Sequence, residues 1–119
     1  MQTYLIGLMY HEPEGWRLWK AGVIEDYESS TGLFVQAQSQ EAALAWGEQV
    51  GEELLRYVNQ DPALDWRELG YFCWVEPNPE QSSWGHCLDF FQRVQSGHHP
   101  DYSQMTAGAY EQWQRGRRE

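Results

Sequence analysis

The amino-acid sequence predicts an α+β fold, in which a mainly antiparallel sheet of about four strands has helices packed on one face. Short stretches rich in β-branched and aromatic residues lie on both sides of one long, strongly periodic helical stretch. Two further helical stretches follow, so the expected order is strand, strand, strand, helix, strand, helix, helix. The 119 residues fit one compact domain, expected over residues 1–114, with a basic frayed tail over residues 115–119.

The first stretch, TYLIGLMY at residues 3–10, is apolar on both of its faces. A strand with this pattern is covered on both sides within the sheet, or has one face buried in an interface. The second alternative leaves a homodimer open.

The following segments predict two more strands. Residues 11–15 contain Pro and Gly and predict a loop, and residues 16–27 predict an irregular strand. Residues 28–32 (ESSTG) predict a turn. Residues 33–38 (LFVQAQ) alternate cleanly and predict a strand with one apolar face.

A helix is predicted after Ser39, which is a good N-cap, with Glu41 placed favourably in the first turn. Its inner stripe recurs at spacings of three and four and comprises Ala43, Trp46, Gly47, Val50, Gly51, Leu54 and Val58. Each glycine costs about 1 kcal/mol in helix propensity, so we expect close packing on a sheet to offset it. The passage from the strand at residues 33–38 to the next strand could be a right-handed crossover that gives one parallel pair.

The C-terminal half predicts one strand and two helices. Residues 70–76 (GYFCWVE) have the composition of a strand. Asn78 as N-cap and Pro79 at the first helical position predict a helix that ends at Gly97. A last short helix is expected around residues 107–115.

The stretch SSWGHCLDFF contains the candidate catalytic residues His86, Cys87 and Asp89. On the predicted helix Cys87 belongs to the apolar stripe with Trp84, Leu88 and Phe91, so it points inward. Neighbouring residues on a helix do not face each other, so His86 cannot serve as its base there. The sequence therefore favours a structural cysteine over a nucleophile.

No metal or cofactor is expected. The two cysteines, Cys73 and Cys87, are 14 residues apart, and structural zinc sites usually show paired short spacings. The segment at residues 98–101 (HHPD) predicts a solvated loop. Phosphate-binding, dinucleotide-binding and serine-hydrolase motifs are absent from the sequence.

The net charge of −10 disfavours binding to nucleic acids and to anionic membranes, and it favours a basic protein partner. The sequence contains neither an 18-residue apolar run nor a signal-peptide pattern. Together with its free thiols, this predicts a cytoplasmic protein.

A surface for that partner is predicted from acidic and aromatic residues. Seven Trp are more than a core of this size needs, and partly exposed Trp near carboxylates is typical of a protein-binding patch. The candidate patch comprises Glu48, Glu52, Glu53, Trp66 and Trp74.

In size, charge and aromatic content the chain resembles small acidic bacterial proteins of the immunity or inhibitor kind. That resemblance implies a non-catalytic domain that neutralises a basic partner. The alternative is a small enzyme or ligand-binding domain, with a pocket between the sheet and its second helix lined by His86, Asp89, Trp74 and Tyr71.

Overall fold

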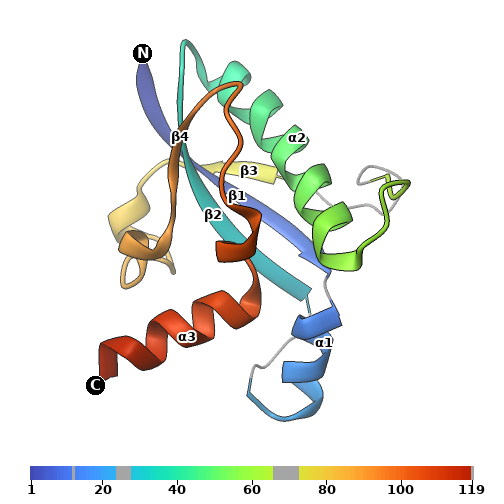
Figure 1. Cartoon of the computed structure of the whole chain (residues 1–119). Helices are drawn as coiled ribbons and strands as arrows, with labels where there is room; N and C mark the ends of the chain where they lie inside the picture. The colour runs from blue at the N-terminus through green and yellow to red at the C-terminus, as the bar shows by residue number, and fades with distance from the viewer. Residues whose placement is uncertain (12, 24–27, 66–72, 119) are drawn as a thin grey trace.

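The computed structural model describes residues 1–11, 13–23, 28–65 and 73–118, and it confirms the α+β fold class (Figure 1). The strands are β1 (Gln2–His11), β2 (Glu28–Ala37), β3 (Cys73–Glu76) and β4 (Arg93–Gln95). The α-helices are α1 (Pro13–Lys20), α2 (Gln40–Asn59) and α3 (Ala107–Arg118).

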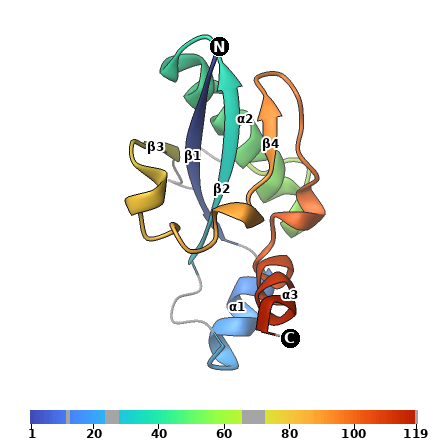
Figure 2. The ribbon, with the colours of Figure 1, turned by 90° about the vertical axis from the view of Figure 1, so that its left-hand side faces the viewer.

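The four strands form one mixed sheet in the order β3-β1-β2-β4, with β3 and β4 at its edges (Figure 2). β1 pairs antiparallel with β2 along its whole length and with β3 over residues 5–8. β4 pairs parallel with β2 over residues 34–36. One parallel pair was expected, but between the strands that flank α2; those strands are not neighbours, because β1 lies between them.

One face of the sheet, which we call the α2 face, packs against α2. Side chains that alternate along β1 and β2 build this core, among them Ile6, Leu8 and Val35. Gly47 brings the helix close, since a Cβ there would lie only 2.6 Å from Ile6 Cγ2. The predicted N-cap is confirmed, because the Ser39 side chain accepts a hydrogen bond from the Ala42 N–H at 3.1 Å.

The opposite face, which we call the aromatic face, is covered by the irregular segment at residues 82–91 and by α3. Its core contains Leu5, Phe34, Cys87 and Phe91. The doubly apolar first strand is therefore covered on both sides by its own chain, so its pattern needs no interface to explain it.

The sequence interpretation is wrong for two segments before α2. Pro13 starts a helix where a loop and then a strand were expected, and the described part of residues 16–27 contains most of α1 and the turn after it. Pro13 at the start and Arg17 and Lys20 in the last turn are helix signals. The expected turn at residues 28–32 belongs to β2.

The predicted helix from Pro79 to Gly97 is also wrong. The segment instead forms short 3₁₀ turns at Pro79–Gln81 and Leu88–Phe90 and the edge strand β4. The last helix was expected around residues 107–115 and is longer, running to Arg118, so most of the expected tail is helical. The predicted strand at residues 70–76 is confirmed in its described part, and residues 70–72 lie outside the described residues.

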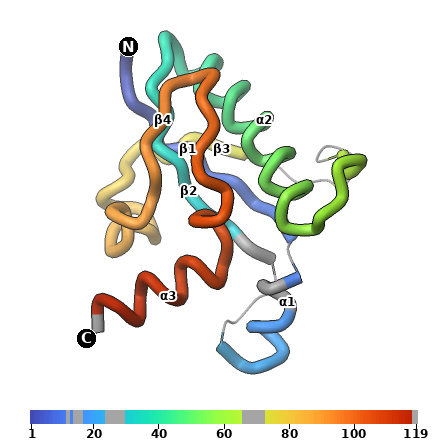
Figure 3. The backbone as a smooth tube through the Cα atoms, in the orientation of Figure 1, coloured from blue at the N-terminus to red at the C-terminus, as the bar shows by residue number. Residues whose placement is uncertain are grey.

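After β4 the chain returns past α2 before it enters α3 (Figure 3). Two hydrogen bonds hold this return in place. The Trp46 indole N–H of α2 donates to the His98 carbonyl at 2.9 Å, and the buried Tyr10 hydroxyl of β1 donates to the Met105 carbonyl at 2.9 Å. The return therefore runs along α2, with His98 beside Trp46 and Tyr102 beside Tyr57.

Candidate protein-binding surface

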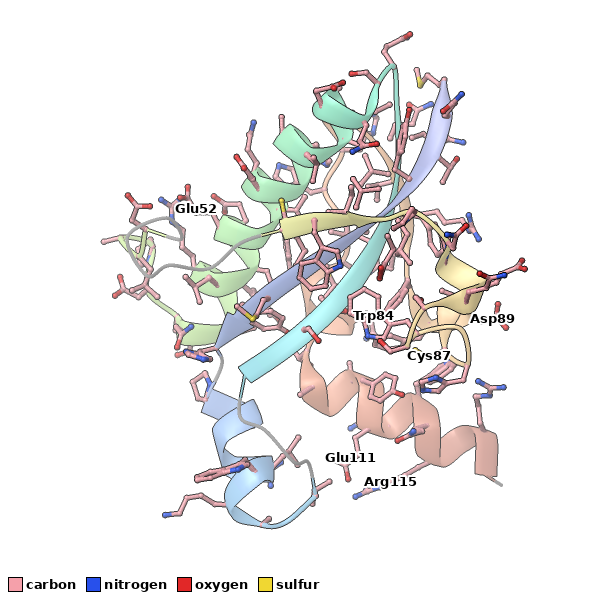
Figure 4. All side chains as sticks on the ribbon, turned by 180° about the vertical axis from the view of Figure 1, so that it is seen from behind. Glu52, Trp84, Cys87, Asp89, Glu111 and Arg115 are labelled. Carbon is pink, nitrogen blue, oxygen red and sulfur yellow. The ribbon has the colours of Figure 1, made fainter. Side chains whose placement is uncertain are left out.

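The three predicted acidic residues lie on α2, and two of them share one cation. Arg56 Nη2 lies 3.1 Å from Glu52, and Arg56 Nη1 lies 3.0 Å from Glu53. The Arg56 Nε–H also donates to the Leu64 carbonyl at 2.8 Å, and this hydrogen bond orients the guanidinium toward both carboxylates. One positive charge between two negative ones leaves this part of α2 acidic, and the side chain of Glu52 points away from the sheet (Figure 4).

A groove of about 470 Å³ lies beside this acidic turn of α2. It is lined by residues from the end of α2, the turn that follows it and the returning chain: Glu53, Arg56, Tyr57, Gln60, Asp61, Pro62 and Tyr102. We call it the tyrosine groove, because the Tyr57 and Tyr102 rings lie side by side, with centroids 6.2 Å apart. Tyr57 is 49% exposed, so its ring is available to a partner.

Local backbone geometry fixes the end of this groove. Gln60 adopts a left-handed conformation with φ of 54°, and its N–H bonds back to the last turn of α2. Asp61 then accepts a hydrogen bond from the Ala63 N–H at 3.0 Å, an Asx turn. Because helix and turn are both capped, the tyrosines and carboxylates sit on an ordered frame.

Tyr102 is held by its neighbours and stays neutral. Its hydroxyl lies 2.6 Å from His99 Nδ1, and the His99 ring packs edge-on against Trp46 with centroids 5.0 Å apart. Burial, with a smaller contribution from the charge of Glu53, raises the pKa of Tyr102 to about 12. The groove therefore presents two tyrosine rings beside the carboxylates of Glu53 and Asp61.

The structure places Trp74, one of the two predicted tryptophans, away from the acidic face of α2. Trp74 lies on the aromatic face, where its ring stacks on Trp84 with centroids 5.8 Å apart, and Trp84 packs against Phe91. Trp66 lies outside the described residues. Trp19 on α1 is exposed by 43%, whereas Trp46 is buried. Much of the tryptophan content is thus used in packing.

The candidate catalytic residues are close in space but do not form an activated nucleophile. Cys87 is only 2% exposed, and burial raises the pKa of its thiol despite a hydrogen bond with the Tyr110 hydroxyl. The same hydroxyl lies 3.3 Å from His86 Nε2. A reactive cysteine needs a lowered pKa and access, and Cys87 has neither. Asp89 is exposed and points away from Cys87 (Figure 4).

The alternative pocket of His86, Asp89, Trp74 and Tyr71 loses its frame, because the second helix that was to form its wall is absent from the described segment at residues 79–97. Tyr71 lies outside the described residues. Among the described residues, no three His, Cys, Asp or Glu side chains are grouped so that they could hold a metal ion. No helix within the described ranges is long and apolar enough to cross a membrane.

Sequence reasoning missed Tyr57 and Tyr102. A signal for Tyr57 was present, since it follows Glu53 by four residues and falls outside the inner stripe of α2. No comparable signal existed for Tyr102, which approaches α2 only because the chain returns after β4.

Comparisons with known proteins identify no relative of this chain. No protein-family model matches it, and neither a curated protein nor a solved structure shows significant similarity to it.

Proposed function

We propose that this protein is a small acidic, non-catalytic binding domain that captures a basic protein partner in the tyrosine groove. The observation that carries the proposal is the tyrosine groove itself. It places the exposed ring of Tyr57 and the ring of Tyr102 next to the carboxylates of Glu53 and Asp61.

The chemistry of the groove suits a lysine or arginine side chain of a partner. A cation over a tyrosine ring is stabilised by about 0.5–2 kcal/mol, depending on how far it is removed from water. Carboxylates beside the rings add a charge-assisted hydrogen bond. Tyrosine also supplies contact area at a small cost in side-chain entropy, because it has only two side-chain torsions.

The net charge of −10 supports the same proposal at longer range. A field of this sign steers a basic partner toward the chain and raises the association rate, an effect that salt weakens. A neutralising role of the immunity or inhibitor kind fits these properties. The buried, raised-pKa thiol of Cys87 supports a binding role over a catalytic one.

The test is a capture experiment from a lysate of the native host, with the tagged protein at about 50 and about 300 mM salt, which straddles the screening range of surface charges. We expect a basic protein to be retained near stoichiometrically at low salt and released at high salt. The partner identified in this way is then purified, and its association and dissociation rates are measured directly.

The matched comparison separates the groove from general charge. Tyr57→Ala should raise the dissociation rate at least tenfold, and Glu53→Gln with Asp61→Asn should slow association and speed dissociation. The control double variant, Glu41→Gln with Asp89→Asn, removes two charges from exposed positions outside the groove. Equal behaviour of Tyr57→Ala and wild type, or equal losses in both double variants, would contradict the proposal.

A further inference from the structure

A second groove lies at the end of the sheet where β1 begins, and residues of both sheet faces line it. Two hollows, of about 510 and about 330 Å³, share four lining residues: Phe34, Pro77, Pro79 and Arg93. Because their walls are shared, the two hollows form one elongated groove, which we call the Arg93 groove. It includes Gln40 at the start of α2, whereas the tyrosine groove lies at the end of that helix, so the two grooves are separate sites.

Apolar side chains on the sheet form the floor of this groove. Val75 offers half-buried apolar surface in the larger hollow and Leu88 in the smaller one, and Pro77 and Pro79 border both. Leu5 and Phe34 lie beneath them and are only 1% and 7% exposed. The groove exists because the chain leaves the sheet at Pro77. Proline cannot donate a ladder hydrogen bond, so β3 stops opposite Leu5 while β1 extends to Gln2.

Arg93 provides the charge on one wall. Its guanidinium lies over the Phe34 ring, with Cζ 4.1 Å from the ring centroid. No carboxylate in the described part of the chain lies within ion-pair distance of it, although the sequence holds 18 acidic residues. An arginine stacked on a ring keeps its donors free in the plane of the guanidinium, which suits a carboxylate.

The opposite wall has the opposite sign. Glu76, at the end of β3, lines the larger hollow, and Glu80, in the 3₁₀ turn after it, lines the smaller one. A ligand that carries a carboxylate alone would meet one favourable and two unfavourable charges. The pattern is complementary to a ligand with a carboxylate toward Arg93, an apolar group over the floor and a basic group toward Glu76 and Glu80.

The shape of the groove favours a peptide over a small molecule. Small ligands usually occupy concave pockets that bury most of their surface. Here two open hollows with shared walls reach from Arg93 on β4 to Glu76 on β3 and Glu80 after it, across the strands between them. A short peptide can span both hollows and place a side chain in each.

From these observations we infer that the Arg93 groove binds a short apolar peptide segment that has a carboxylate at one end and a basic residue at the other. Arg93 binds the carboxylate, Val75, Pro77 and Leu88 contact the apolar side chains, and Glu76 and Glu80 select the basic residue. This site does not depend on the tyrosine groove, so either proposal can fail alone.

The test uses a defined probe, the peptide acetyl-Lys-Leu-Leu-Phe with a free C-terminal carboxylate, titrated into the whole protein and followed by amide NMR shifts. We expect saturable shifts at Phe34 and Arg93. The C-terminal amide of the same peptide should bind about tenfold more weakly, as expected for the loss of one charge-assisted hydrogen bond. The amidated peptide acetyl-Lys-Leu-Leu-Glu carries its carboxylate on a side chain, and it should bind more tightly than the amidated acetyl-Lys-Leu-Leu-Phe.

Variants assign the effect to the named residues. Arg93→Gln should abolish the difference between acid and amide, whereas Arg115→Gln on α3, which removes the same charge elsewhere, should preserve it. Glu76→Gln with Glu80→Gln should abolish the preference for Lys over Glu at the first position of the peptide. The side chains changed in these variants are exposed or half-buried, so we expect each variant to fold. A thermal melt of each variant checks this.

Three outcomes would overturn the inference: equal affinity of acid and amide, shifts confined to residues outside the Arg93 groove, or binding that Arg93→Gln leaves unchanged. The last measurement titrates a small acid, 3-phenylpropionate, into the protein. If it binds as tightly as the peptide, the occupant is a small molecule and the peptide assignment is wrong.

Discussion

At the residue scale, glycines allow two aromatic rings to lie directly on the sheet. A Cβ at Gly7 would clash with the indole ring of Trp74, and a Cβ at Gly32 would lie 2.6 Å from the Phe91 ring. The rings of the aromatic face thus replace side chains that the strands lack. This explains how a thin sheet accommodates so many large rings on one side.

We predict that Gly7→Ala destabilises the protein by about 1–3 kcal/mol, the usual cost of overpacking, because the Trp74 ring must move. Urea unfolding followed by tryptophan fluorescence measures this change. Gly116→Ala is the matched control, since nothing lies within 4 Å of its Cβ and the site is helical. It should be neutral or stabilising by up to about 1 kcal/mol; equal effects of both variants would show that packing against Trp74 is not the cause.

The thiols provide a prediction on pH. Burial, and secondarily the charge of Glu48, raises the pKa of Cys73 from 9.0 to about 11. The folded state therefore favours the neutral thiol. The resulting stability is fully present below pH 9 and is lost as the pH rises from about 9 to about 11.

Thermal unfolding midpoints between pH 8 and pH 11 should fall for wild type and fall less steeply for Cys73→Ala. Burial raises the pKa of Tyr102 as well, to about 12, so that residue adds a further loss above pH 10 in both proteins. Parallel curves for the two proteins would contradict the contribution of Cys73.

At the element scale, the sequence predicted α2 and β1 well because their periodic patterns are long. α2 has a capping serine and seven stripe positions, and β1 is apolar on both faces over eight residues. The segment at residues 79–97 was misread for a physical reason. In this segment the Cys87 N–H bonds to the Trp84 carbonyl and the Phe91 N–H bonds to the Leu88 carbonyl, so i,i+3 contacts reproduce part of a helical stripe.

The contrast between regular elements and irregular segments also explains which residues of the candidate site could be predicted from the sequence. Glu52 and Glu53 could be predicted because they lie on a regular helix, whose outer face follows from its inner one. Tyr102 and Arg93 could not, because the return of the chain and the edge pairing of β4 place them. Trp74 was assigned to the correct strand but to the wrong surface, because sequence alone does not tell which face α2 covers.

For α2 we predict that Ser39→Ala lowers the free energy of unfolding by about 1 kcal/mol, since the Ala42 N–H loses its acceptor. Chemical denaturation measures the change. Ser39→Asp should restore most of the stability, because aspartate caps equally well and its charge favours the helix N-terminus. Failure of that rescue would show that the loss comes from elsewhere.

At the scale of the whole molecule, the net charge of −10 acts on stability as well as on partners. Like charges on a compact chain repel one another, and salt screens them. We therefore predict that the unfolding midpoint rises by a few degrees between about 20 and about 300 mM NaCl, while any partner captured in the tyrosine groove is released over the same range. Differential scanning calorimetry measures the first effect; a midpoint that falls with salt would mean that attractive ion pairs outweigh the repulsion.

The position of β1 also sets the order in which the fold can be completed during synthesis. This strand is made before the other described strands yet lies in the middle of the sheet, and the aromatic side chains that cover its second face come from residues 74–113. Its buried Tyr10 hydroxyl donates to the carbonyl of Met105, 95 residues later. During synthesis Leu5 and Phe34 therefore stay open to water until residues 84–113 have been made, and in this period the chain depends most on dilution or on chaperones.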